Sequence, residues 1–361
     1  MYVVTNRHVD ESAGGIEQFG AVPNKQGNNE LRLARVSRAG RGWNVQFYDD
    51  LLDPGEAREL IAECRLSLDP NVQHFASLKV ACELARRAEE KQRHILFFVH
   101  GYNNDMAAVM QTAHSLELAY DVEVLTFSWP ARGGGWRGKA SYLSDKRDAR
   151  ASSGALERCL MKMRQHLMLI SESAQLALRT QAERKHPENA EQRDALLAQL
   201  LQKHCGLSIN AMFHSMGNYL YKQMLKSSIN EGNGLIFDNV VLCQADVNNR
   251  WHADWVDRIA HNRRVFITIN ENDHALRLSR IKPGSAQRAR LGHYIKRLDS
   301  RVANYINLTN AAWVRNSHSP FAEPAEKNQA LKQFFLDAFS GKPAELSLKY
   351  RPETHCYELP R

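Results

Sequence analysis

A serine stands near the middle of the chain, where an apolar strand pattern changes sharply into a helical one. The run is Ile209-Asn-Ala-Met-Phe-His-Ser-Met-Gly-Asn218. Strand, tight turn and helix in this order expose a serine hydroxyl at the edge of a sheet, where a base can remove its proton. Gly217 lets the following backbone approach closely, because it carries no side chain. Ser215 is therefore a candidate nucleophile; the alternative is an ordinary strand–helix junction that contains a serine.

A second signal lies upstream, at the end of the apolar segment 94–99. His100-Gly101 follows this segment, and hydrolases with a strand–serine–helix junction place an oxyanion donor there. We expect the backbone amides of Tyr102 and Met216 to donate to the oxyanion of a tetrahedral intermediate. Losing one such donor typically costs about 10²–10³ in rate. A plain turn would explain His100-Gly101 alone, but the two signals together favour catalysis.

Composition limits the class of protein. The chain has 361 residues, of which 43% are hydrophobic, enough for the core of one elaborated domain or two small ones. It contains no apolar stretch long enough to span a membrane, and its start lacks the apolar segment of a signal peptide. The cysteines lie far apart without metal-ligand spacing, so free thiols in a cytoplasmic protein are the simplest interpretation. We expect neither a metal nor an organic cofactor.

The net charge of +8 is diffuse. Basic residues concentrate in 132–150 and 277–301, where they are mixed with acidic ones and lack an interleaved aromatic pattern. A solvated surface is the expected role, and nucleic acid is an unlikely partner. An anionic substrate or a phospholipid surface is the alternative.

Strand and helix patterns alternate, which indicates an α/β fold with a mostly parallel central sheet and helices on both faces. We expect strands at 2–5, 43–48, 94–99, 122–129, 208–213, 239–243, 265–269 and, as the last one, 305–308. We expect helices at 76–92, after Asn104 or Asp105, at 216–227, and around Leu331, Phe334, Phe335 and Ala338. The glycine-rich stretch 10–29 is expected to be a long loop.

The segment before the serine strand is longer than a crossover helix needs. Residues 155–184 and 189–204 both have helical patterns, separated by the segment around Pro187. We expect one domain over 1–361 that carries a helical hairpin insertion at 166–205. The insertion could cover the active site, bind a protein partner or a second copy of the chain, or merely lengthen a helix.

Eight short motifs together resemble a largely uncharacterised bacterial branch of the α/β-hydrolase superfamily. Members of this branch carry an H-G-Y-N strand end, an S-W-P strand end and an H-S-M-G-N turn in this order. The resemblance covers most of the chain except 166–205 and 10–40, and it implies the α/β-hydrolase fold and a serine, acid and histidine triad. Here the motifs are Tyr2–Arg7, Phe98–Asn103, Ser128–Pro130, His214–Asn218, Ala245–Val247, Asn272–Leu276, Arg290–Gly292 and His318–Pro320.

Two positions differ from the pattern of this branch. The crowded position two residues before the nucleophile, usually Gly or Ala, is Phe213. A second acid after the following strand is replaced by Asn248.

The acid is assigned by its place after a strand. In this fold the triad follows the chain order serine, acid, histidine, and the acid usually follows the second strand after the nucleophile. Asp273 follows that strand, so it is favoured over Asp246, which follows the strand before, and over Glu271 as a third candidate.

The base is expected to be His318, because it follows the last expected strand and a loop can return its imidazole to the serine. His274 is too close in sequence to Asp273, and His293 precedes the last strand. His252, His261 and His355 suit surface or structural roles.

These residues predict a serine hydrolase that cleaves a carboxylic ester or a related acyl bond of a small-molecule or lipid substrate. The competing class is a non-catalytic member that uses the fold for binding or assembly. A third hypothesis is a lipase or phospholipase acting on anionic lipid, which would give the basic residues a role.

Overall fold

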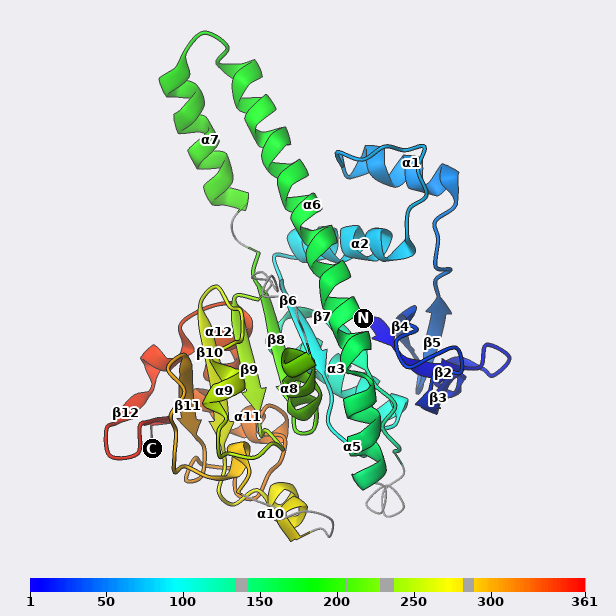
Figure 1. Ribbon diagram of the computed structural model, residues 1–361. Helices are drawn as coiled ribbons and strands as arrows, with labels where there is room; N and C mark the ends of the chain where they lie inside the picture. Colours follow the sequence, from blue (N-terminus) through cyan, green and yellow to red (C-terminus); the bar gives the residue numbers. More distant parts are fainter. Residues whose placement is uncertain (134–141, 205–206, 228–236, 282–288, 361) are drawn as a thin grey trace.

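The computed structural model describes residues 1–133, 142–204, 207–227, 237–281 and 289–360. The described residues form an eleven-stranded sheet in the order β12-β13-β11-β10-β9-β8-β6-β7-β1-β4-β5 (Figure 1). Its strands are β1 (Tyr2–Thr5), β4 (Arg32–Ala39), β5 (Gly42–Phe47), β6 (His94–Val99), β7 (Val122–Ser128), β8 (Ile209–His214), β9 (Asn239–Cys243), β10 (Arg264–Ile269), β11 (Ala303–Asn307), β12 (Lys349–Arg351) and β13 (Cys356–Glu358). The strands from β13 to β1 pair in parallel. Antiparallel β12, β4 and β5 flank them, so the sheet is mostly parallel, as predicted.

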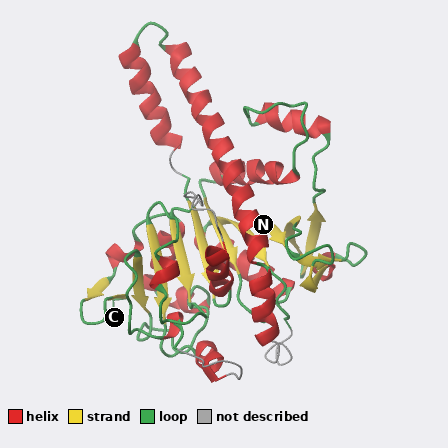
Figure 2. Cartoon of the chain, viewed as in Figure 1, coloured by secondary structure: helices red, strands yellow, loops and turns green. Residues whose placement is uncertain are grey.

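Helices cover both faces of the sheet. One face packs against α2 (Ala76–Glu90), the start of α6 (Ser153–Lys185), α8 (Gly217–Ser227) and α9 (Ala253–Val256). The other packs against α3 (Met106–Tyr120), α11 (Glu323–Lys327) and α12 (Gln329–Phe339). The remaining helices are α1 (Pro54–Glu63), α5 (Tyr142–Ala151), α7 (Ala190–His204) and α10 (His274–Ile281). Figure 2 shows the strands enclosed between these layers.

The short elements complete the chain. They are the hairpin of β2 (Arg7–Val9) and β3 (Phe19–Pro23) and the 3₁₀ turns η1 (Gly15–Gln18), η2 (Leu291–His293) and η3 (Ala344–Ser347).

The start of α3 illustrates how local sequence sets an element. The side chain of Asp105 accepts a hydrogen bond from the amide of Ala108 and caps the helix. Apolar residues then recur at helical spacing and are buried against the sheet, as predicted: Met106, Val109, Met110 and Ala113.

Two expectations about strands are wrong. The stretch 10–29 is not one long loop, since it contains η1 and β3, and β4 follows it. In β4 only Ala34 and Val36 are buried, while Arg35 between them and Ser37 and Arg38 after them are exposed, so its apolar signal is weak. The last strand is not β11, because β12 and β13 extend the sheet beyond it with three residues each. Such short strands give little alternation to recognise.

The helical segment before β8 has two parts. The first turns of α6 are buried in the core through Leu156, Cys159 and Leu160. Beyond them, α6 and α7 extend away from the sheet as an antiparallel pair (Figure 1). Leu196, Leu197, Leu200 and Leu201 on α7 are only half-buried. The two predicted helices are confirmed, and the domain limits of the insertion stay a prediction.

Deleting Ser171 to Lys203 and joining the ends with a short glycine–serine linker should leave a folded core. The reason is that α7 packs against α6, whereas the sheet is covered by the first turns of α6. Circular dichroism and labelling of Ser215 by an active-serine probe measure the result, with the full chain as reference. Substrate preference or partner binding should change. An insoluble or unfolded deletion would show that the leucines of α7 belong to the core.

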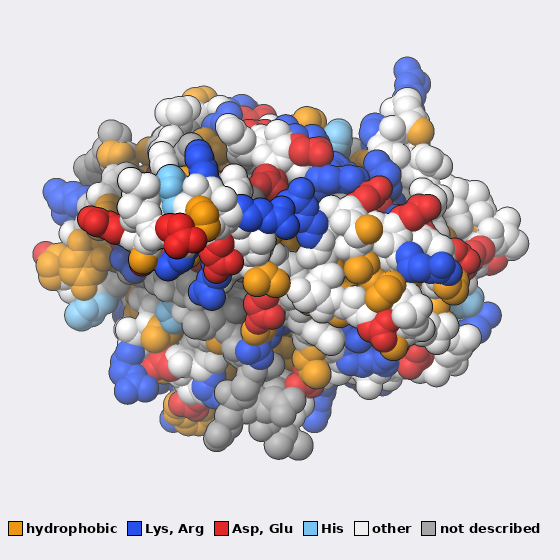
Figure 3. Space-filling view, turned by 90° about the horizontal axis from the view of Figure 1, so that it is seen from above, with side chains coloured by type: hydrophobic (Ala, Val, Ile, Leu, Met, Phe, Trp, Pro, Cys, Tyr) orange, Lys and Arg blue, Asp and Glu red, His pale blue; other side chains and the backbone are white. Residues whose placement is uncertain are grey.

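The surface agrees with a diffuse positive charge. On the face shown in Figure 3, lysine and arginine side chains are interspersed with aspartate and glutamate. Within the described ranges, no helix combines the length and apolarity required to cross a bilayer.

Candidate active site

Ser215 occupies a sharp turn between β8 and α8. Its φ of +52° lies in the left-handed region, a conformation that is strained for a residue with a side chain. Three backbone hydrogen bonds hold this turn: the Ser215 amide donates to Cys243 O (3.0 Å), and the amides of Asp246 and Asn218 donate to Ser215 O (both 3.1 Å). The side-chain amide of Asn218 also donates to Ser215 O (3.1 Å). The turn is thus fixed to the ends of β8 and β9.

Glycines surround this turn because side chains would collide there. A Cβ on Gly101 would lie 2.8 Å from the Cβ of Ser215. A Cβ on Gly217 would lie 2.8 Å from the carbonyl oxygens of His100 and Val99. Both glycines therefore allow the strand end after β6 to contact the serine turn directly.

Phe213 does not prevent this turn. Its side chain is fully buried on the core side, where its ring stacks on Tyr221 with centroids 3.9 Å apart and meets Phe97 edge-on at 6.3 Å. The large residue is accommodated because it points into the core and not into the turn.

Asp273 and His318 are in direct contact. Nδ1 of His318 donates to Oδ2 of Asp273 over 2.7 Å. The buried carboxylate also accepts hydrogen bonds from Gln244 Nε2 (3.1 Å) and from the amide of Leu276 (3.0 Å). Burial acts to raise the pKa of Asp273, but the nearby His318 and these hydrogen bonds outweigh it, so the pKa lies below its usual value. Asp273 is thereby kept ionised.

The two other candidate acids lie in different surroundings. Asp246 forms a buried ion pair with Arg290 (3.0 Å) and accepts a hydrogen bond from the hydroxyl of Tyr142 (3.0 Å). Glu271 accepts a hydrogen bond from the amide of Ile295 (3.3 Å). Asn248, which stands where the family pattern has a second acid, accepts a hydrogen bond from Arg290 (2.7 Å).

His318 is held beside the serine turn by the residue that precedes the serine. Nε2 of His214 donates to the carbonyl oxygen of His318 (2.8 Å), and the two rings lie 4.9 Å apart. Burial lowers the pKa of His214 to about 3, so its ring is neutral. The His318 side chain is 23% exposed, and because Nδ1 binds Asp273, Nε2 is left for the serine.

Hydrogen bonds and a ring contact hold the loop that carries Tyr102. Nδ1 of His100 donates to Gly101 O (2.7 Å), and the ring stacks on Trp129 at 5.2 Å. The side-chain amide of Asn104 donates to the carbonyl oxygens of Gly101 (3.2 Å) and Tyr102 (2.9 Å). The sequence thus predicted the position of the loop, but not these supports.

The sequence matches a known protein family. Residues 78–173 and 178–333 match the model of the family described as alpha/beta hydrolase of unknown function (DUF900). The match covers more than half of the chain. This chain is an alpha/beta hydrolase of the DUF900 family. Neither a curated protein nor a solved structure matches it.

This DUF900 hydrolase uses a buried arginine to support the loop. Arg7 is 1% exposed and donates to Ser128 Oγ (2.9 Å), Ala131 O (3.0 Å) and Asn104 O (3.0 Å). Burial lowers the pKa of Arg7 to about 10, so it is still charged at neutral pH. The sequence places Arg7 in a motif but indicates no role for it, because its partners are too distant along the chain for a local pattern to show.

Arg7→Met should lower the free energy of unfolding by about 3 kcal/mol, since it leaves several buried acceptors without donors. Urea unfolding measures this loss. Arg35→Met on the exposed side of β4 is the matched control and should change stability by less than about 0.5 kcal/mol. Equal midpoints for the two variants would contradict the supporting role.

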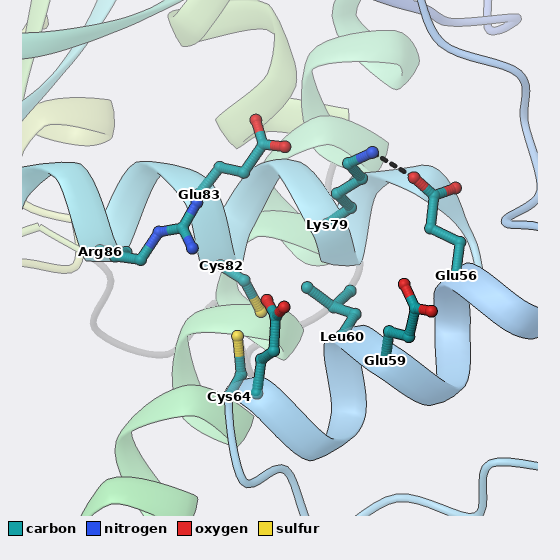
Figure 4. Close-up of a pocket in the computed structure, with 9 residues that line it drawn as sticks. Glu56, Glu59, Leu60, Cys64, Lys79, Cys82, Glu83 and Arg86 are labelled. Carbon is teal, nitrogen blue, oxygen red and sulfur yellow. Dashed lines mark hydrogen bonds and ion pairs between the residues drawn. The ribbon is translucent and has the colours of Figure 1, made fainter.

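A separate cavity of about 170 Å³ lies between α1 and α2. In Figure 4 the sulfurs of Cys64 and Cys82 face each other, and Lys79 pairs with Glu56. Both thiols are free. The DUF900 hydrolase brings no group of three metal-ligating side chains together within its described residues.

Proposed function

We propose that this chain is a serine hydrolase that cleaves a carboxylic ester or a related acyl bond. The main observation behind the proposal is the hydrogen bond between His318 and Asp273. His214 binds the backbone of His318 and so holds it beside the turn in which Ser215 has a positive φ. Membership of an alpha/beta-hydrolase family supports the same reaction class.

Each residue has one role. Ser215 Oγ attacks the carbonyl carbon while His318 Nε2 removes its proton, and Asp273 orients the imidazole and stabilises the imidazolium. The amides of Tyr102 and Met216 donate to the oxyanion. The tetrahedral intermediate collapses as His318 gives its proton to the leaving alcohol, which leaves an acyl-enzyme. Water, activated by His318, then releases the acid.

A fluorophosphonate probe tests the proposal on the pure protein. The wild type should be labelled once, on the peptide that contains Ser215, and should release a burst of nitrophenolate from nitrophenyl esters before steady turnover. A chain-length series of these esters then gives the acyl preference. A folded protein that is neither labelled nor active would favour the binding-module hypothesis.

Asp273→Asn should reduce kcat about 10⁴-fold, because an amide at this position favours the unproductive tautomer of His318 while keeping its geometry. Steady-state hydrolysis of a nitrophenyl ester measures the loss. Asp246→Asn is the matched control, since this carboxylate pairs with Arg290. Should Asp246→Asn cost as much and Asp273→Asn little, the acid is Asp246.

A further inference from the structure

Two packed helices beside the serine turn bring cations together. Tyr219, Lys222 and Lys226 lie on one face of α8, at helical spacings of three and four residues. Lys146 of α5 reaches the same face, with its Nζ 5.0 Å from the ring centroid of Tyr219. Arg150 follows Lys146 by one turn of α5, and its charge acts on Tyr219 as well. Four cations thus share the region where α5 packs on α8.

Among the described residues, the lysines of this cluster have few carboxylates near them. Helix α8 contains no acidic residue. In the described part of the chain, Lys146, Lys222 and Lys226 form no ion pair with a carboxylate. The charge of Asp246, which is already paired with Arg290, acts on Lys146, and the charge of Asp254 acts on Lys222.

Lys146 and Lys222 are half-buried and repel each other. Burial, followed by the charge of Lys226, lowers the pKa of Lys222 to about 8, and Lys146 and Arg290 add to this effect. Burial and Arg290 also lower the pKa of Lys146. Four cations held together with fewer carboxylates nearby create a positive potential that an anion would relieve.

The cluster is connected to the nucleophile. Tyr142, one turn before Lys146 on α5, donates to Asp246 (3.0 Å), and the amide of Asp246 donates to Ser215 O (3.1 Å). Helix α8 begins two residues after Ser215 and rises 1.5 Å per residue, so Lys222 lies roughly 8 Å along it from its first residue.

We propose that Lys146 and Lys222, with Arg150 and Lys226 beyond them, bind an anionic group of the substrate, a carboxylate or a phosphate. The inference rests on the proposed function: the ester cleaved at Ser215 carries a negative charge that reaches the face of α8 near Lys222 and Lys226, roughly 8 and 14 Å along the helix from its first residue. A free acid and a lipid headgroup both offer this chemistry.

Two esters of equal length test the inference in solution. Mono-nitrophenyl sebacate ends in a carboxylate, whereas nitrophenyl decanoate ends in a methyl group. The measured quantity is the ratio of their kcat/KM values. In the double variant Lys146→Gln/Lys222→Gln this ratio should fall about tenfold, mainly through KM, and added salt should lower the wild-type ratio. Lys349→Gln, exposed on β12, is the control and should keep the wild-type ratio.

Vesicles distinguish the two sources of the anion. Fatty-acid release is compared between phosphatidylcholine vesicles and vesicles that also contain phosphatidylglycerol. If the double variant loses only the preference for anionic vesicles, the anion is a lipid headgroup; if it loses only the preference for sebacate, the anion is a soluble acid. Unchanged preferences in both assays overturn the inference.

A binding measurement separates this inference from the proposed function. Titration with sebacate or inorganic phosphate should raise the melting temperature of the wild type and not that of the double variant. If the wild type resists the fluorophosphonate probe yet shows this shift, the proposed function fails and the anion site stands. If it is labelled but shows neither the shift nor a charge preference, the anion site fails alone.

Discussion

Ser215→Ala is expected to abolish fluorophosphonate labelling and to reduce kcat/KM for nitrophenyl esters by about 10⁴–10⁶. No other group in the turn can form the acyl-enzyme, so only the oxyanion donors and substrate binding would contribute to the residual rate. The fold should persist, because the backbone hydrogen bonds of Ser215 to Cys243, Asp246 and Asn218 do not involve its side chain.

Ser208→Ala provides the matched control. Ser208 is a buried serine just before the other end of the same strand, where it accepts a hydrogen bond from Asn210. This variant should be labelled like the wild type. If Ser215→Ala keeps its label while folded, the nucleophile lies elsewhere.

His318→Ala is expected to remove activity almost as completely as Ser215→Ala, because the triad acts as a unit. The substitution keeps the carbonyl oxygen that accepts the hydrogen bond of His214, so the loop should stay in place. Labelling rate and kcat/KM measure the loss, and added imidazole should restore part of the rate.

His355→Ala, on the exposed turn before β13, is the control and should match the wild type. A second control is His293→Ala, whose histidine is buried near Asp273. If His293→Ala loses labelling while His318→Ala keeps it, the assignment of the base is wrong.

The sequence predicts those parts of the fold that depend on neighbouring residues. The strand–turn–helix pattern around Ser215 is contiguous, so β8 and α8 could be placed to within a residue or two. Strands β4, β12 and β13 could not, because few of their residues are buried. Their partners in the sheet, not their own side chains, decide that they are extended.

In the candidate site, too, some residues can be predicted from the sequence and others cannot. Chain order and strand counting predict that Asp273 and His318 belong together, and the two side chains are in contact. The supporting roles of His214, Gln244 and Arg7 cannot be predicted from the sequence. Their hydrogen bonds join segments that are 104, 29 and 121 residues apart, and such pairings leave no local pattern. Their catalytic consequences remain predictions.

The position of β1 has a consequence for how the molecule assembles. This strand can pair with β4 early, but it also pairs in parallel with β7, and the neighbouring Arg7 binds Ser128 and Ala131. These pairings with β7 and the residues after it cannot form until more than 120 further residues have been synthesised. Long-range pairings of this kind slow folding. His318 is added later still. A chain emerging from the ribosome would therefore carry Ser215 well before His318, and the proposed hydrolysis would begin only when nearly all of the sheet has formed.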